Sequence, residues 1–215
     1  MRLGGVTLDI SNSLLVSWII SGILIILAFL ATRRLQANPG KLQNMLELLV
    51  ETVNNLCKGS IGARHWRPFA PYIFGLLTYL AMCNLIALIN FVPFVKFYPP
   101  TKDINVTGAL ALMTLVLILY ASFRYKGVKG WLRSLIDPLP MIAPFKVLEY
   151  VTKPVSLCLR LFGNILAGFV IMEMVFMVIP YVSEPFSLYF DIFDGILHAF
   201  VFTYLTTLYI GEAIE

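Results

Sequence analysis

The chain has 215 residues, of which 59% are apolar and 13% are charged, and its mean hydropathy is +0.84. Soluble globular domains average about 45–50% apolar and about 25% charged residues. These departures exclude a soluble domain, a disordered chain and a nucleic-acid-binding protein with an exposed basic face. The net charge of +4 is interpreted as basic anchors in cytoplasmic loops. The composition therefore indicates an integral membrane protein in the lipid bilayer.

Five apolar stretches are long enough to cross a bilayer, which takes about 20 residues of helix. Residues 14–31 form the first, and because no small-residue cleavage site precedes them, they are interpreted as a retained span rather than a signal peptide. Between the first two stretches, apolar residues recur every three or four positions, which predicts an amphipathic helix at the membrane interface. We expect a single all-α membrane domain over residues 1–215, with spans at 13–32, 69–92, 104–124, 145–179 and 186–211 and the interfacial helix at 40–57.

The fourth predicted span is unusually long. At 1.5 Å per residue it extends about 50 Å, whereas the hydrocarbon core is about 30 Å thick, so it must tilt strongly, kink or run partly along the interface. Pro154 interrupts it, and Pro180 and Pro185 after it predict a turn. The last two spans therefore form a long, strongly tilted helical hairpin.

Basic residues are distributed unevenly between the two sides of the membrane. The predicted outer side carries only Arg2, Lys96 and Lys102, whereas the loops after the first and third spans carry most of the others. Because cytoplasmic loops carry an excess of Lys and Arg, we predict that the N-terminus is outside and the C-terminus is cytoplasmic. The basic residues on the cytoplasmic side are Arg33, Arg34, Lys41, Lys58, Arg64, Arg67, Arg124, Lys126, Lys129, Arg133 and Lys146.

Arg160 lies inside an apolar run of the fourth span. A charged side chain at a helix centre costs at least about 2.5–3.5 kcal/mol, so it usually faces a partner, a watery cavity or a transported ion. The alternative is that a tilted helix lets the side chain reach the headgroups. Glu149 and Lys153 on the same face are interpreted as a surface ion pair. Steps of three or four residues trace one polar face that ends in small residues: Glu149, Lys153, Ser156, Arg160, Asn164, Ala167 and Gly168.

The last span carries a second polar face. Asp191, Asp194 and His198 are spaced so that they share one side of a helix, and acids in line with an imidazole are the ingredients of a proton relay. A metal site from Asp194 and His198 is the alternative, although no further ligands converge in the sequence. An intramembrane hydrolase using this pair would also need a nucleophile and oxyanion donors, which no segment supplies together.

The remaining polar residues in or near the spans leave more than one interpretation. Glu173 is rotated about 140° from the arginine's face of the fourth span and is expected to contact a different neighbour. Asn84 and Asn90 either line a hydrated path or hydrogen-bond between helices. Asp103 and Asn105 form either a helix cap or a channel mouth.

The cysteines give no sign of a metal or disulfide framework. Cys57, Cys83 and Cys158 form no CxxC pair and have no His at ligand spacing, so we interpret them as small core residues and expect no metal or cofactor.

Three segments resemble subunit a of the bacterial F-type ATP synthase. They are KPVSLCLRLFGNILAG at 153–168, PGKLQNMLELLVE at 39–51 and DINVT at 103–107, in the family's order. The resemblance implies a non-catalytic stator subunit in the bacterial plasma membrane, whose last two helices pack against a rotating ring of c subunits. It also implies the peripheral-stalk subunit b and the rest of the ATP synthase as partners, with no nucleic acid.

The family's mechanism is implied by the same resemblance. Two offset half-channels lead H⁺ or Na⁺ to the carboxylates of the ring, and Arg160 matches the essential arginine that favours the ionised rotor carboxylate and blocks direct leakage. Asn164 matches a polar position one turn on, and His198 falls where many bacterial members have Gln. The alternative function is a self-contained secondary ion transporter, for which we find no inverted repeat.

The sequence departs from the family at one position. Asp191 falls where some members have a His that pairs with a Glu on the preceding helix, but Phe169 occupies that Glu position and the nearest acid is Glu173. We hypothesise that Asp191, Asp194 and Glu173 line the outer half-channel. The departure leaves the choice between H⁺ and Na⁺ open. Further candidates for lining the half-channels are Asn84, Asn90, Asp103, Asn105 and Ser156.

Overall fold

The computed structural model confirms an all-α membrane fold. Apart from two antiparallel two-residue strands, β1 (Arg2–Leu3) and β2 (Val6–Thr7), the described residues are helical or lie in short connections. The structure describes residues 2–3, 6–7, 12–33, 40–86, 99–136 and 143–214. Side chains are described within these ranges except at 2–3, 6–7, 133–136, 143, 180–187 and 190–191.

Four helices are long and apolar enough to cross a membrane, namely α1, α4, α5 and α6. The apolar helix α3 is shorter, and residues 87–92 of the second predicted span lie outside the described residues. The amphipathic pattern predicted between the first two spans forms helix α2. The helices are α1 (Asn12–Thr32), α2 (Lys41–Ile61), α3 (Ala70–Leu85), α4 (Ile104–Ile136), α5 (Ala143–Val178) and α6 (Pro180–Ile214), with a 3₁₀ turn, η2 (Pro100–Lys102), before α4.

Three helices extend beyond the predicted spans. The third span lies in the part of α4 before Gly127, where non-helical backbone angles (φ 70°, ψ 166°) kink the chain, and a second helical segment continues from there to Ile136. Helix α2 runs past 57 to Ile61, where Gly62 with φ 90° ends it. Helix α6 begins at Pro180 rather than 186, because proline lacks an N–H and fits a first helical position. Pro185 therefore lies inside α6 instead of in the turn.

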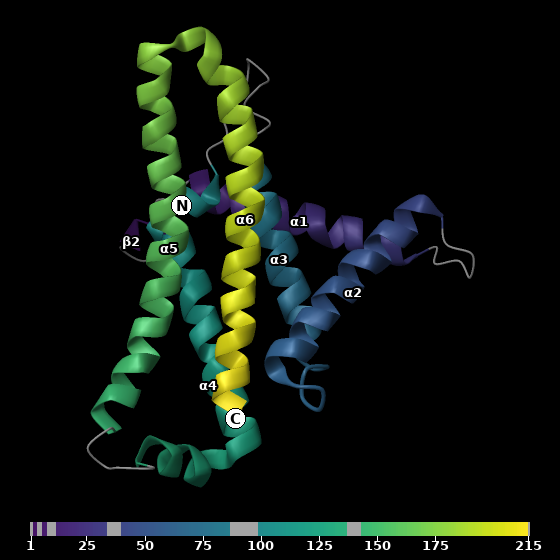
Figure 1. Cartoon of the computed structure of the whole chain (residues 1–215), viewed down its shortest axis with the longest axis vertical. Coiled ribbons are helices and arrows are strands. Elements are labelled where there is room, and N and C mark those ends of the chain that lie inside the picture. The colour runs from purple at the N-terminus through teal and green to yellow at the C-terminus, as the bar shows by residue number, and fades with distance from the viewer. Residues whose placement is uncertain are drawn as a thin grey trace.

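Helix α6 is the centre of the bundle. It contacts α2, α3, α4 and α5, and it forms the predicted hairpin with α5, while α1 and α2 extend to one side (Figure 1). Small side chains let helices approach closely. The buried hydroxyls of Thr203 and Thr206 donate to the carbonyls of Ala199 and Phe202 in α6 itself, so they need no partner from another helix. The small buried residues of α6 are Gly195, Ala199, Thr203, Thr206, Thr207, Gly211 and Ala213.

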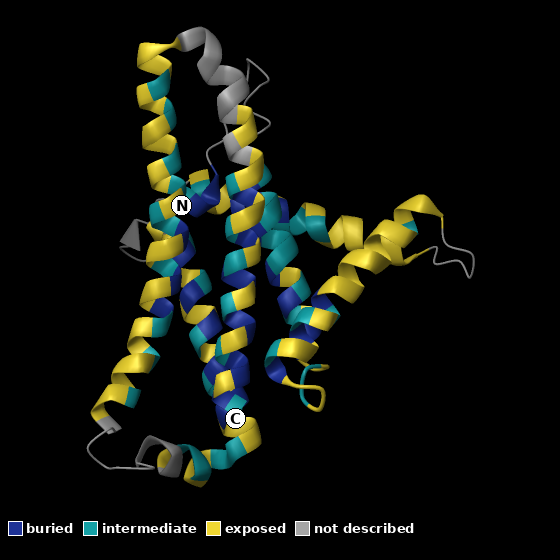
Figure 2. Cartoon of the chain, viewed as in Figure 1, coloured by how far each residue is buried: buried dark blue, intermediate teal, exposed yellow. Residues whose placement is uncertain are grey.

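Helix α5 is the least covered of the long helices. Of its described side chains only Pro154, Leu157 and Leu161 are buried, and much of its length is exposed (Figure 2). Its many exposed apolar side chains face lipid or another protein in a membrane. The hairpin of α5 and α6 therefore presents a long surface that this chain does not cover.

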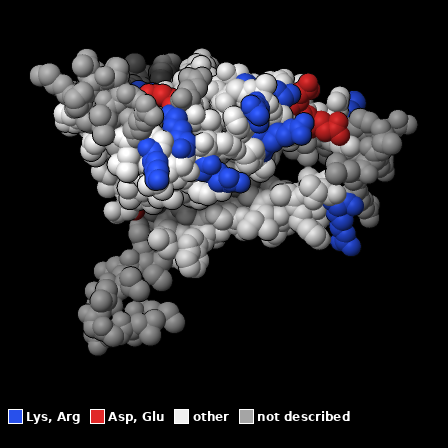
Figure 3. All heavy atoms as spheres, turned by 90° about the horizontal axis from the view of Figure 1, so that it is seen from below, with Lys and Arg blue, Asp and Glu red and all other residues white. Residues whose placement is uncertain are grey.

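One end of the bundle collects basic side chains. The rings of His65 and Tyr125 are 4.5 Å apart, which joins the loop after α2 to the end of the straight part of α4. At the same end, Lys153 Nζ near the start of α5 lies 2.9 Å from a carboxylate oxygen of Glu212 near the end of α6. Seen from this end, Lys and Arg side chains outnumber the acidic ones (Figure 3).

Two of the three cysteines are fully buried, as expected for core residues. Cys57 and Cys83 are buried and Cys158 is partly buried. Burial raises the pKa of the Cys57 thiol to about 11, so this side chain is uncharged and unreactive at neutral pH.

Replacing Gly211 with Ala is expected to destabilise the contact between α2 and α6. A Cβ at this position would collide with the backbone carbonyl oxygen of Ser60, which cannot move without shifting the end of α2. We expect a loss of at least about 2 kcal/mol, measured as a lower thermal unfolding midpoint of the purified chain in detergent.

The matched control is Gly75→Ala in α3, where a Cβ would meet nothing within 4 Å. This variant should keep the stability or gain about 0.5–1 kcal/mol from the better helix propensity of Ala. Equal midpoints for the two variants would contradict the close approach at Gly211.

Candidate functional site

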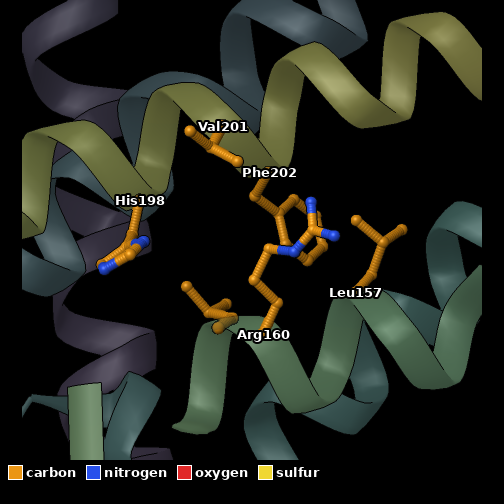
Figure 4. A pocket seen from close by; sticks show the side chains of 6 residues that line it. Leu157, Arg160, His198, Val201 and Phe202 are labelled. Atoms are coloured by element: carbon orange, nitrogen blue, oxygen red, sulfur yellow. The ribbon is translucent and has the colours of Figure 1, made fainter. Parts of the chain in front are cut away.

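Arg160 projects from α5 toward α6 at the middle of the hairpin. Its side chain lines a small pocket and points toward the α6 side chain of Phe202 (Figure 4). The residues that line this pocket are Leu157, Arg160, Leu161, His198, Val201 and Phe202.

The position of Arg160 on the helix explains why it is not covered. Leu157 and Leu161 are 1% and 2% exposed and form the packed face of α5, whereas Arg160 is exposed at the edge of that face. Among the described residues Arg160 forms no ion pair or hydrogen bond. A permanent charge in an apolar helix is stabilised by a carboxylate or water. The described part of this chain supplies no carboxylate for it.

A hydrogen-bonded chain of three side chains lies beside Arg160. His198 Nε2 is 2.7 Å from Asp194 Oδ1 within α6, and His198 Nδ1 is 3.2 Å from Asn164 Nδ2 across the hairpin. The side chains of His198 and Asp194 are 11% and 34% exposed, so the imidazole is enclosed while the carboxylate stays accessible. The predicted faces of the fourth and fifth spans therefore meet at Asn164 and His198.

The partners of His198 fix the position of its proton. A carboxylate only accepts, so in the neutral imidazole Nε2–H donates to Asp194 and Nδ1 accepts from the Asn164 amide. A second proton on Nδ1 would require Asn164 to rotate its amide and present its oxygen. The same three side chains can thus hold His198 in either protonation state.

Asp194 lies in a gap that the small residues of α5 leave open. A Cβ on Gly168 would be 3.6 Å from Asp194 Oδ2, which is ordinary contact. The neighbouring residue, Gly195, is approached so closely by Asn84 of α3 that a Cβ there would lie 2.9 Å from the Asn84 Cβ. Asn84 thus packs closely against the backbone of α6 at the residue that follows Asp194.

Asn84 forms the hydrogen bond between helices that was one of its two predicted roles. It is 5% exposed, its Nδ2 donates to the Gly195 carbonyl at 2.8 Å, and its Oδ1 accepts from Thr101 Oγ1 at 2.7 Å. Asp103 forms the helix cap that was one alternative for it, because its Oδ1 accepts from the Asn105 backbone N–H at 3.0 Å. Asn105 itself is exposed.

The other candidate residues are not brought to this chain of hydrogen bonds. Ser156 is exposed one turn before Arg160, and Glu173 is exposed further along α5. The backbone of Asp191 lies in α6, but its side chain lies outside the described residues, as does all of Asn90. Within the described residues, no third potential metal ligand joins Asp194 and His198.

The predicted ion pair of Glu149 and Lys153 is confirmed, with 3.2 Å between the charged atoms. The bond of Lys153 to Glu212 was not predicted, because the two residues are far apart in sequence. Lys102 was also missed: its Nζ lies 3.8 Å from the centre of the Phe169 ring. Nothing in the local sequence around Lys102 indicates this contact.

The sequence from residue 14 to 211 matches the family model of the ATP synthase A chain. The match reaches from near the start of α1 to near the end of α6, so it includes Arg160 and the three hydrogen-bonded side chains beside it. It covers far more than half of the chain.

Proposed function

The chain belongs to the ATP synthase A chain family, and we propose that it is the stator that carries ions to and from a ring of c subunits. As a member of the family it is the multi-pass subunit a of the membrane sector, an ion-translocating rather than catalytic subunit. In the proposed mechanism, two offset half-channels carry H⁺ or Na⁺, and Arg160 forces the ion to travel round with the ring.

The exposure of Arg160 is the observation that carries the proposal. Its guanidinium is permanently charged, lies in a span and has no carboxylate partner among the described residues. A ring carboxylate is the partner that this site lacks. When the ionised carboxylate passes Arg160 it is stabilised without its ion, and the positive charge prevents a free cation from crossing between the half-channels.

The chain of Asp194, His198 and Asn164 supports an ion path on one side of Arg160. Its members connect the accessible carboxylate of Asp194 to a side chain one turn from Arg160, with both nitrogens of the enclosed imidazole engaged. We assign this path to the outer half-channel, with Asp191 and Glu173 as further acidic groups at its entry. The basic end of the bundle supports a cytoplasmic C-terminus.

The remaining lining positions follow from this assignment. Ser156 lies on the opposite side of Arg160 along α5 and is a candidate for the inner half-channel. Asn105 at the start of α4 is a candidate for the outer mouth, and subunit b is expected to hold the chain against rotation.

The test separates a stator from a self-contained secondary transporter. The purified chain alone, reconstituted in vesicles, should carry no H⁺ or Na⁺ against a gradient, because the ring supplies the ion-binding carboxylate. Complexes assembled without the chain should hydrolyse ATP without pumping, and adding the chain during assembly should restore pumping. Gradient-driven uptake by the chain alone would contradict the proposal.

A further inference from the structure

The 3₁₀ turn η2 contacts α5 and the α3–α6 interface through two consecutive residues. Lys102 Nζ lies 3.8 Å from the centre of the Phe169 ring on α5, which is a close cation–π contact. Thr101, which is fully buried, donates from Oγ1 to Asn84 Oδ1 at 2.7 Å, and Asn84 donates to the carbonyl of Gly195 on α6 at 2.8 Å. The turn therefore contacts α5 directly and is linked to α6 through Asn84 of α3.

Each of these anchor points adjoins a residue of the candidate site. Phe169 follows Gly168, and Gly195 follows Asp194. Gly168 and the Asp194 carboxylate face each other, with 3.6 Å between Oδ2 and the Cβ position of Gly168. The two contacts of η2 thus lead, through Phe169 and through Asn84, to the residues that follow Gly168 and Asp194.

The hydrogen bond between Asn164 and His198 depends on the same register. It joins α5 to α6, so a shift of either helix along or away from the other lengthens it beyond its present 3.2 Å. Hydrogen bonds weaken steeply when distance and angle depart from their optimum. A contact that holds the register of the hairpin therefore acts on the chain of hydrogen bonds without touching it.

We propose that Thr101 and Lys102 are positioning residues for ion transfer, and that η2 fixes the register of α5 and α6 at Asp194 and His198. The inference rests on the proposed function of these two side chains as an ion path. Lys102 acts through the face of Phe169, and Thr101 acts through Asn84. Neither residue needs to touch the transported ion.

The test measures passive ion conduction per assembled membrane sector at an imposed potential, together with ATP hydrolysis. We expect Lys102→Met to lower conduction about threefold or more, and Lys102→Arg to retain it, because a guanidinium also binds over an aromatic face. Phe169→Leu should also lower conduction, and the loss in the double variant should be smaller than the sum of the two single losses. Lys129→Met, which removes an exposed charge at the other end of α4, is the matched control.

A parallel pair of variants tests the second contact. Thr101→Val removes the hydroxyl at nearly constant volume and should lower conduction, whereas Thr101→Ser should retain it. Equal losses for Lys102→Arg and Lys102→Met, or additive losses in the Lys102/Phe169 double variant, would overturn the role of the cation–π contact. If Asp194→Leu leaves conduction unchanged, the proposed ion path itself fails. If Asp194→Leu abolishes conduction while Lys102→Met and Thr101→Val do not change it, only the positioning role fails.

Discussion

Complete ATP synthase complexes that carry Arg160→Ala are expected to lose ATP synthesis driven by an imposed ion gradient and to leak the ion instead. One elementary charge that falls through 100 mV releases about 2.3 kcal/mol, and this energy turns the ring only if the ion cannot cross directly. Without the guanidinium, a cation meets no fixed positive charge between the half-channels. We expect the rate of synthesis to fall at least about 100-fold, to the background. This factor corresponds to a difference of about 2.7 kcal/mol in activation free energy.

Arg124→Ala is the control for this loss. Arg124 is an exposed arginine at the basic end of α4, so its replacement removes the same side chain away from the hairpin. Synthesis and passive leak should both stay near the wild-type values. A wild-type rate of synthesis in Arg160→Ala would show that the arginine is a structural residue.

Breaking the chain of hydrogen bonds beside Arg160 is the second large effect expected. His198→Leu removes both the bond to Asp194 at 2.7 Å and the bond to Asn164 at 3.2 Å. Leaving a charged or enclosed group without its hydrogen bond costs about 1–3 kcal/mol. Because this cost raises the free energy of an ion path that uses these groups, we expect ion conduction to fall about tenfold or more. The measurement is the initial rate of passive conduction per assembled membrane sector.

His198→Gln is the informative comparison, because glutamine both donates and accepts a hydrogen bond but carries no titratable proton. It should conduct better than His198→Leu. Asp194→Asn should lower conduction, whereas Glu51→Gln, at an exposed acid on α2, should not change it. Equal conduction rates for His198→Leu and wild type would show that these three hydrogen-bonded side chains are not part of the ion path.

Periodicity and composition were sufficient to predict the all-α fold and the two polar faces that meet in the hairpin. The positions of Asn164 and His198 follow from helical spacing once α5 and α6 are paired, and Arg160 stands out because a charge in an apolar run needs a partner. The ion pair of Glu149 and Lys153 was equally predictable from the sequence, because both residues lie on one helix.

The contacts that hold the hairpin in register were not predictable in this way. The bonds of Asn84 to Gly195 and of Lys153 to Glu212, and the contact of Lys102 with Phe169, each join segments that are distant in sequence. Local patterns specify which face of a helix is apolar but not how far along its neighbour it packs. The start of α6 at Pro180 was not predicted, because proline is compatible both with a turn and with the first turn of a helix.

In the proposed mechanism Arg160 couples ion flow to rotation, and ATP-driven pumping measures this coupling. ATP hydrolysis and ion uptake are measured in the same vesicles, for the wild-type complex and for Arg160→Ala, with Na⁺ present and with Na⁺ removed. We predict continued hydrolysis without any ion gradient in the variant, and the Na⁺ dependence of the wild-type complex identifies the transported ion. Coupled pumping by Arg160→Ala at the wild-type ratio of ions to ATP would contradict this role of Arg160.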